Sequence, residues 1–334
     1  MSLRRARFVP LRVVIQKGSR AAELYKKAEG LHPDALAPGL APSPEQDLKF
    51  RGGKTIQDLN FINFYVAGQS AWDANEIQKI DTALSAAMSD TDLNNVMMQY
   101  FGNQPITSTF AGSRQLAGDA PAVVSQGDTE ALVASLNDNG MLAGLDLSST
   151  LVNLLLPPGT ILTTDPSTSS EFVRTARVRD KRVMPDDDEA SSLNGLGGYH
   201  GSVHVGGDAG AIIYYAVGVY SEALPDGSQN GIPVFNENWK NVVATFYHEL
   251  NEARTDPDVE DAIRTGDTSV LGWTSDTGEE CGDFPVDEAG QGGDLSLVFQ
   301  EVPLTSGSGT VPVQFQYSNA VHGPEGPIEE PHQP

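Results

Sequence analysis

Residues 238–253 constrain the fold of this chain more than any other segment. Their apolar side chains recur at three- and four-residue spacing, which is typical of an amphipathic helix. These side chains are Trp239, Val242, Val243, Phe246, Leu250 and Ala253. At about 100° per residue, they form one helix face, and His248 and Glu252 lie on the opposite face. The pattern predicts a helix packed on a core through its apolar side, with Pro257 helping to end it.

The polar face of this predicted helix carries the sequence His248-Glu249-Leu250-Asn251-Glu252. Residues four apart lie on one helix face, so His248 and Glu252 can ligate the same ion. Glu249, one position further round, can then act as a base toward a metal-bound water. This is the arrangement of His-Glu-x-x-His zinc hydrolases, with a carboxylate in place of the second imidazole. The alternative is a helix whose histidine and glutamate merely face water.

A mononuclear zinc site needs a third protein ligand, and an acidic loop downstream can provide it. Residues 271–283 contain Glu280 and Asp283, which we predict to complete the metal site. Cys281 is a softer ligand in the same loop, but we favour the carboxylates. The alternatives are a solvated surface turn, or a calcium site that uses Asp276 with Glu280 and Asp283, because oxygen ligands alone satisfy a hard cation.

A Gly-rich stretch upstream, residues 197–204, contains two of the six histidines of the chain. We predict that His200 and His204 take part in ligation or catalysis. The alternative is that both are hydrogen-bonded turn histidines. His204, Tyr199 or Tyr247 is also placed to stabilise a developing oxyanion, which hydrolysis of a carbonyl compound requires.

Several of these motifs, taken in order, resemble the plant Exordium, or phosphate-induced protein, family and its bacterial relatives. The likeness runs from about Gly52 to Ala320 and rests on short motifs. They are Arg51-Gly-Gly-Lys-Thr-Ile56, Asn60-Phe-Ile-Asn-Phe-Tyr-Val66, Leu151-Val-Asn-Leu-Leu-Leu156, Gly198-Tyr-His-Gly-Ser202, Tyr247-His-Glu-Leu-Asn-Glu-Ala253, Asp256-Pro257, Gly272-Trp273, Glu280-Cys-Gly-Asp283 and Val313-Gln-Phe-Gln-Tyr-Ser-Asn-Ala320.

The resemblance implies a metal site at the positions that match the family motifs. These are His248, Glu249 and Glu252, with His200, Glu280 and Asp283 as companions. Cys281 stands where the family has an aliphatic residue, and the scattered cysteines of the plant proteins are absent from this sequence. The family is associated with growth and starvation rather than with one defined reaction.

Together, these motifs predict a metal-dependent hydrolase, most plausibly a zinc peptidase or amidase that acts on a peptide or small-molecule substrate. Zinc is the expected cofactor, and manganese or calcium is the alternative because carboxylate ligands favour harder ions. In this prediction Glu249, His200 and His204 are catalytic, and His248, Glu252, Glu280 and Asp283 hold the metal. The competing prediction is a non-catalytic, Exordium-like binding or signalling protein with a structural metal site. A third alternative is that no metal binds.

The composition limits the classes of partner that the chain is expected to bind. Its 334 residues carry a formal net charge of −24, with a pI near 4.4, which argues against nucleic acid or anionic lipid as a partner. No apolar run approaches the ~20 residues of a membrane-spanning helix. The start of the sequence shows no clear signal peptide, so we expect a cytoplasmic protein or one secreted without disulfides. The single Cys281 excludes an intrachain disulfide, and no oligomeric state follows from the sequence.

Strand and helix patterns alternate along the chain, which predicts the α/β (α+β) class, a mixed sheet with packed helices and a zincin-like metal-site helix. We expect strands at 60–66, 151–156, 211–219, 295–301 and 311–317, and further helices at 74–89, 92–100 and 128–136. By analogy with zinc hydrolases, the strand at 211–219 would line a substrate cleft.

The predicted domain organisation is a single metal-binding domain with two extensions. Residues 1–50 are expected to form an extended arm or linker, residues 51–322 the α/β domain, and residues 323–334 a disordered tail. A polar excursion is expected near 163–195. Its acidic run at 186–189 is predicted to be solvated, with a calcium-binding loop as the alternative.

Overall fold

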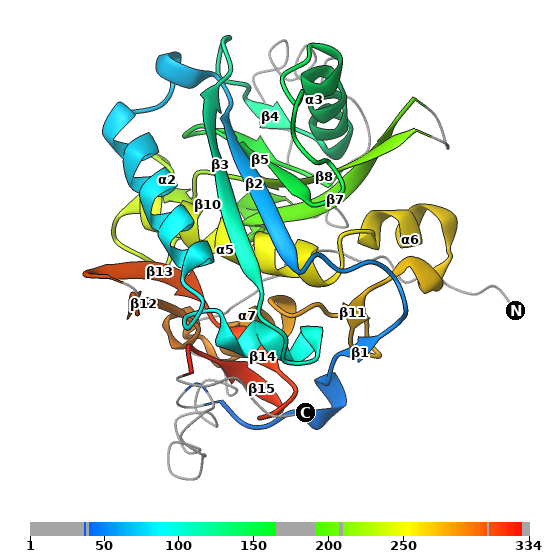
Figure 1. Ribbon diagram of the computed structural model, residues 1–334. Coiled ribbons are helices and arrows are strands. Elements are labelled where there is room, and N and C mark those ends of the chain that lie inside the picture. Colours follow the sequence, from blue (N-terminus) through cyan, green and yellow to red (C-terminus); the bar gives the residue numbers. More distant parts are fainter. Residues whose placement is uncertain (1–36, 38–39, 165–190, 207–209, 306, 329–334) are drawn as a thin grey trace, which may run out of the picture.

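The computed structural model describes residues 37, 40–164, 191–206, 210–305 and 307–328. It confirms the predicted α/β class, because a five-stranded mixed sheet is packed against helices (Figure 1). The strands run in the order β3 (Thr107–Gln115), β2 (Asp58–Tyr65), β5 (Thr150–Leu155), β8 (Ala211–Gly218) and β7 (Gly198–Val205). The first four are parallel, and β7 is antiparallel to β8.

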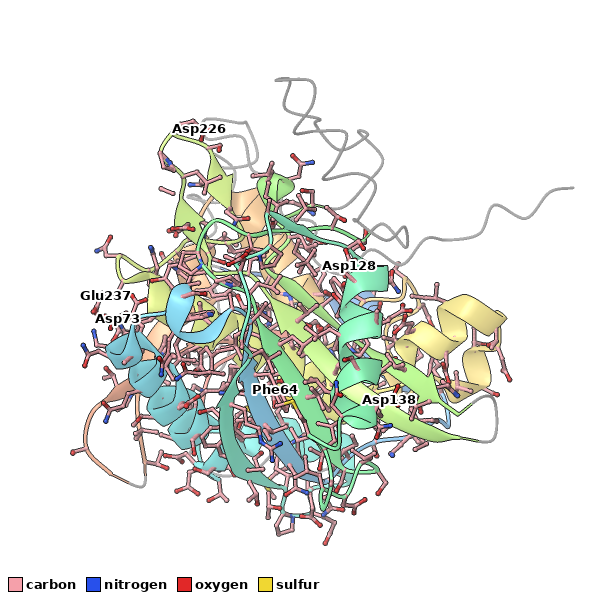
Figure 2. The ribbon with its side chains drawn as sticks, turned by 90° about the horizontal axis from the view of Figure 1, so that it is seen from above. Phe64, Asp73, Asp128, Asp138, Asp226 and Glu237 are labelled. Atoms are coloured by element: carbon pink, nitrogen blue, oxygen red, sulfur yellow. The ribbon has the colours of Figure 1, made fainter. Side chains whose placement is uncertain are left out.

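Two helices cover one face of this sheet and a third covers the other. Helices α2 (Ala74–Ser89) and α5 (Asn238–Thr255) pack on each other and beneath the strands. Helix α3 (Gln126–Asp138) lies over β7 and β8, as the view from above shows, with Asp128 and Asp138 near its two ends (Figure 2). Because the central strand β5 is buried along its whole length, its sequence is an almost continuous apolar run.

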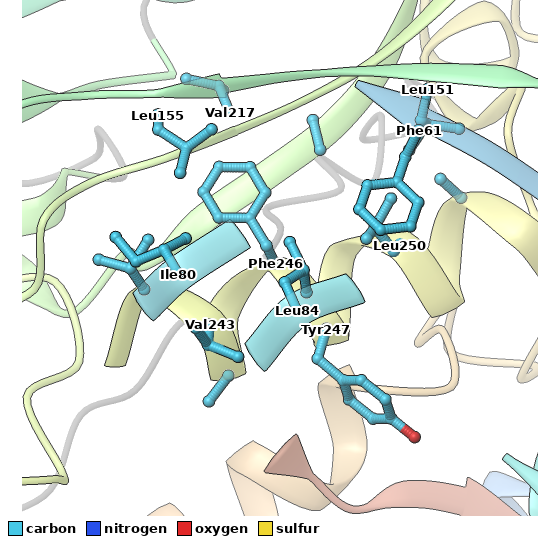
Figure 3. Close-up of a cluster of buried hydrophobic side chains, with 14 of the residues drawn as sticks. Phe61, Ile80, Leu84, Leu151, Leu155, Val217, Val243, Phe246, Tyr247 and Leu250 are labelled. Atoms are coloured by element: carbon cyan, nitrogen blue, oxygen red, sulfur yellow. The ribbon is translucent and has the colours of Figure 1, made fainter. Parts of the chain in front are cut away.

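The main core lies between the sheet and helices α2 and α5. Phe246 and Leu250 of α5 are fully buried and point toward the strands, where Phe61 lies close to Leu250 (Figure 3). Leu84 of α2 belongs to the same cluster and lies near Phe246. Full burial of such side chains contributes roughly 1.5–3 kcal/mol each, so this core fixes α5 against the sheet.

A C-terminal layer covers the other side of α5. It contains α7 (Asp283–Gly292), the hairpin of β12 (Phe299–Pro303) and β13 (Thr310–Gln314), and the pair β14 (Gln316–Ser318) and β15 (Gly323–Glu325) (Figure 1). Strand β13 packs directly on α5. As a result, every α5 residue from 241 to 255 is buried, and the alternative that His248 and Glu252 merely face water is wrong.

The remaining elements are short and connect these layers. They are β1 (Lys49–Phe50) paired with β11 (Trp273–Thr274), β4 (Val123–Val124) with β6 (Ile161–Leu162), β9 (Glu222–Ala223) with β10 (Gln229–Asn230), helix α6 (Val259–Thr265), and the 3-10 helices Pro44–Gln46, Gly68–Ser70, Asn95–Phe101, Ser192–Asn194, Thr268–Val270 and Leu295–Leu297. Among the described residues, no helix is both long and apolar enough to span a membrane.

Several predicted elements differ in type or extent. The helix expected at 92–100 is a 3-10 helix, and the strand expected at 295–301 begins as a 3-10 turn before β12. The strand expected at 311–317 is divided into β13 and β14. The strand expected at 211–219 is β8, and its residues 214–218 are paired on both sides and have no free edge for a substrate.

The chain extensions are partly ordered by pairing with distant segments. Residues 323–325, expected to be disordered, form the buried strand β15, because their backbone pairs with β14. Residues 49–50 of the expected arm pair with β11 in the same way. Most of the predicted excursion, including the acidic run at 186–189, lies outside the described residues.

Candidate metal site

The predicted ligands His248 and Glu252 lie at the centre of a buried cluster. Nε2 of His248 is 3.0 Å from Oε2 of Glu252, and neither atom makes a hydrogen bond of regular geometry. Donor atoms around a tetrahedral zinc ion lie roughly 3.4 Å apart, so this spacing suits two ligands of one ion. Asp283, at the start of α7, adds a third ligand atom, and the three atoms lie within 4.8 Å of one another.

The orientation of the His248 ring is fixed by a hydrogen bond on the nitrogen that does not face Glu252. Its Nδ1 donates a 2.6 Å hydrogen bond to Oε1 of Gln314 on β13. The amide nitrogen of Gln314 donates in turn to the carbonyl of Gly282, which turns the Gln314 oxygen toward the ring. Nε2 is therefore the ring nitrogen that faces Glu252. Metal-binding histidines are typically held by this kind of partner on the second ring nitrogen.

His200, on strand β7, also approaches Glu252. Its Nε2 donates a 3.0 Å hydrogen bond to the carbonyl of Asp256. Its Nδ1 lies 3.4 Å from Oε2 of Glu249 and 3.7 Å from Oε2 of Glu252. These three side chains form a second group of ligand atoms within 4.8 Å of one another, and all three are buried.

Gly282 allows the loop before α7 to approach the helix closely. Its amide donates a 3.0 Å hydrogen bond to Oε1 of Glu252. A Cβ atom at this position would lie 2.3 Å from Nδ1 of His248 and 2.9 Å from Oε1 of Glu252. Only glycine fits this contact without a shift of the loop.

The carboxylates and imidazoles of this cluster shift one another's pKa values. Burial by itself lowers the pKa of His248, but the nearby Glu252 outweighs it and raises the pKa to about 10. Burial likewise lowers the pKa of His200, while Glu280 and Glu249 raise it well above its usual value. Burial raises the pKa of Glu249, whereas His248 holds that of Glu252 below its usual value despite its burial. Such clustering of shifted groups is common at functional sites.

The two acidic residues of the loop occupy different places in the cluster. Burial raises the pKa of Glu280 to about 7, and its Oε1 lies 3.4 Å from Nε2 of His200, the nitrogen that points away from Glu249 and Glu252. Glu280 is therefore beside His200 and in neither ligand group. Asp283 lies in the group of His248, and burial also raises its pKa well above the usual value.

Other candidates lie outside the two ligand groups. His204, on the same strand as His200, pairs with Asp261 of α6 at 2.8 Å. Asp276, part of the alternative calcium site, instead pairs with Lys49 and Arg51 at the surface. Cys281 is buried and donates its thiol hydrogen to Gln316.

The two tyrosines considered as oxyanion donors have other partners. The hydroxyl of Tyr199 donates to Thr129, and that of Tyr247 donates to Asn94. The residues that orient the site, Gln314 and Gly282, were not among the predicted site residues. The sequence signal for Gln314 is a polar side chain in the strand predicted at 311–317, a signal that Gln316 shares.

Comparisons with known protein families, with curated proteins and with solved structures found no match. The resemblance to the Exordium family therefore stays a prediction. The geometry by itself indicates a site that can hold a cation, because the free nitrogen of His248 and carboxylate oxygens of Glu252 and Asp283 converge in a buried place.

Proposed function

We propose that this protein is a metal-dependent hydrolase that cleaves a peptide or amide bond, with the ion held by His248, Glu252 and Asp283. One observation carries the proposal: buried, unpartnered ligand atoms of His248 and Glu252 converge directly beside the carboxylate of Glu249. A divalent ion bound there would polarise a carbonyl and make a water more acidic.

Glu249 is the residue placed to handle the proton in this reaction. Its Oε1 makes no hydrogen bond and lies 4.0 Å from Nε2 of His248. Because burial raises the pKa of this carboxyl, it can hold a proton taken from the attacking water and return it to the leaving amine. The remaining oxygen faces His200, which keeps the side chain in place.

The first experiment is elemental analysis of the purified protein beside two variants. We expect zinc or manganese in the wild type, and a lower metal content in His248→Ala. His322→Ala is the matched control, because this histidine pairs with Asp47 away from the cluster. Absence of transition metal from the wild type after reconstitution would remove the proposed function.

Catalysis is tested separately with a panel of peptide substrates. Glu249→Gln keeps the shape of the side chain and removes its basicity. We expect loss of roughly 10²–10⁴-fold in turnover, with the ion at His248 still bound. Unchanged turnover would exclude Glu249 as the proton acceptor.

The burial of the cluster favours a second candidate, a binding protein with a structural metal. His248 is 1% exposed and both Glu249 and Glu252 are 0% exposed, as expected of a closed structural site. In that case chelation would sharply lower the unfolding temperature, and no peptide would be hydrolysed. A catalytic site would lose turnover on chelation with a smaller change in unfolding temperature.

A further inference from the structure

We propose that the cluster binds two divalent cations rather than one, with a second ion held by His200, Glu249 and Glu252 beside the ion of His248, Glu252 and Asp283. This inference rests on the proposed function and extends it, since the first position alone would suffice for hydrolysis. Each group of three ligand atoms lies within 4.8 Å, and the two groups share Glu252.

The two histidines are prepared for ligation in the same way. Each donates one ring N–H to an amide-type oxygen, His248 to Gln314 and His200 to the carbonyl of Asp256. Each turns its other nitrogen toward Oε2 of Glu252, at 3.0 Å for His248 and 3.7 Å for His200, whose Nδ1 also contacts Oε2 of Glu249 at 3.4 Å. One ion in the group of His248 would not account for the ring of His200, which belongs to the other group around the shared carboxylate.

The cluster also has buried oxygen ligands beyond those of the first ion. Glu249, Glu252, Glu280 and Asp283 each have a carboxylate oxygen that is buried and lacks a hydrogen bond. Within the described part of the chain, the recorded ion pairs of these carboxylates involve only the imidazoles of His200 and His248. Glu249 belongs to the second ligand group and not to the first, so the first ion by itself leaves its buried Oε1 without a partner.

Glu249 can act both as a ligand of the second ion and as the proton acceptor, because its two oxygens face different neighbours. Oε2 lies 3.4 Å from Nδ1 of His200, which suits a shared ion, while Oε1 stays unpartnered on the side of His248. Paired divalent ions are a common device for hydrolysis, because one ion can bind the substrate and the other the attacking water.

The test is the metal content of protein reconstituted with zinc, measured by native mass spectrometry. We expect two ions per chain in the wild type, one in His200→Ala and one in His248→Ala. His204→Ala is the matched control: it lies on the same strand, pairs with Asp261, and should keep two ions. Glu249→Gln, which preserves side-chain volume, should also hold one ion and covers the case in which His200→Ala does not fold.

The outcomes separate the two proposals. One ion in the wild type that is retained in Glu249→Gln and lost in His248→Ala would overturn the second site and leave the proposed function standing. Two ions in both His200→Ala and Glu249→Gln would equally overturn the assignment. No ion in the wild type would remove the proposed function together with this inference.

Discussion

The amide of Gly282 donates a hydrogen bond of 3.0 Å to Oε1 of Glu252, and this contact leaves Oε2 of the same carboxylate facing the two histidines. The loop before α7 thus orients the central ligand of the cluster through its backbone. Because the contact depends on the absence of a side chain at Gly282, it can be tested by adding a single methyl group.

We expect Gly282→Ala to destabilise the protein by about 1–3 kcal/mol and to lower its metal content, since the new methyl group forces the loop away from His248 and Glu252. Denaturant unfolding and elemental analysis measure the two effects. Gly307→Ala is the control, because a Cβ atom there meets nothing within 4 Å. Equal behaviour of the two variants would contradict the close packing of the loop.

Removal of the Gln314 side chain tests the orientation of His248. Gln314→Ala takes away the acceptor of the Nδ1 hydrogen bond, and we expect metal affinity to fall roughly 10–100-fold. Competition with a chelator of known affinity measures the change. Gln300→Ala, on the neighbouring strand β12, should leave affinity unchanged, because among the described residues its amide donates to the carbonyl of Leu297 and not to the cluster. Wild-type affinity in Gln314→Ala would show that the ring needs no such support.

The core beneath the sheet gives a prediction about stability. Phe246 is fully buried among α2, α5 and the strands, and its replacement by alanine should cost about 3–5 kcal/mol. Ile263→Ala on α6 is the comparison, because that side chain is 50% exposed, and its effect should stay within about 0.5 kcal/mol. A small effect at Phe246, read from chemical unfolding, would mean that α5 does not pack as described.

A pH-dependent effect is expected at Glu260 of α6, away from the metal cluster. Its carboxylate accepts from Gln126, from the amide of Ser202 and from the hydroxyl of Tyr215. Burial, with Glu130 adding to it, raises the pKa of Glu260 from 4.5 to about 7.

The sign of this effect follows from proton binding. Between pH 4.5 and about 7 the folded protein holds a proton on Glu260 that the unfolded chain has released, so stability falls as the pH rises through this window. Glu260→Gln should therefore gain stability relative to the wild type, on the order of 1–2 kcal/mol at pH 8 after allowance for solvent screening, and little at pH 4.5. A pH-independent difference between the two unfolding curves would refute the assignment.

The sequence predicted the parts of the fold that depend on local periodicity. Helix α2 spans Ala74–Ser89 as its apolar spacing indicates, and α5 spans Asn238–Thr255, two residues longer than its pattern. The pairing of His248 with Glu252 is equally local, because one helical turn brings them together.

Contacts between distant segments could not be predicted in the same way. His200 meets Glu249 across 49 residues, and Gln314 meets His248 across 66. A pattern of polar residues on a helix indicates exposure, and so it missed the C-terminal layer that covers α5. The type of the segment at 295–301 was misjudged for a related reason, since a short apolar run does not distinguish a turn from a strand.

The position of α5 between the sheet and the β12–β13 hairpin has a consequence for how the protein is made. During synthesis, the strands and α5 emerge from the ribosome before residues 310–314, which carry the partner of His248. Until this hairpin has been synthesised, the carboxylates of the cluster are exposed to solvent. The enclosed form of the proposed site is thereby completed only at the last stage of folding, and a chain stalled before β13 would display its acidic centre without the layer that encloses it.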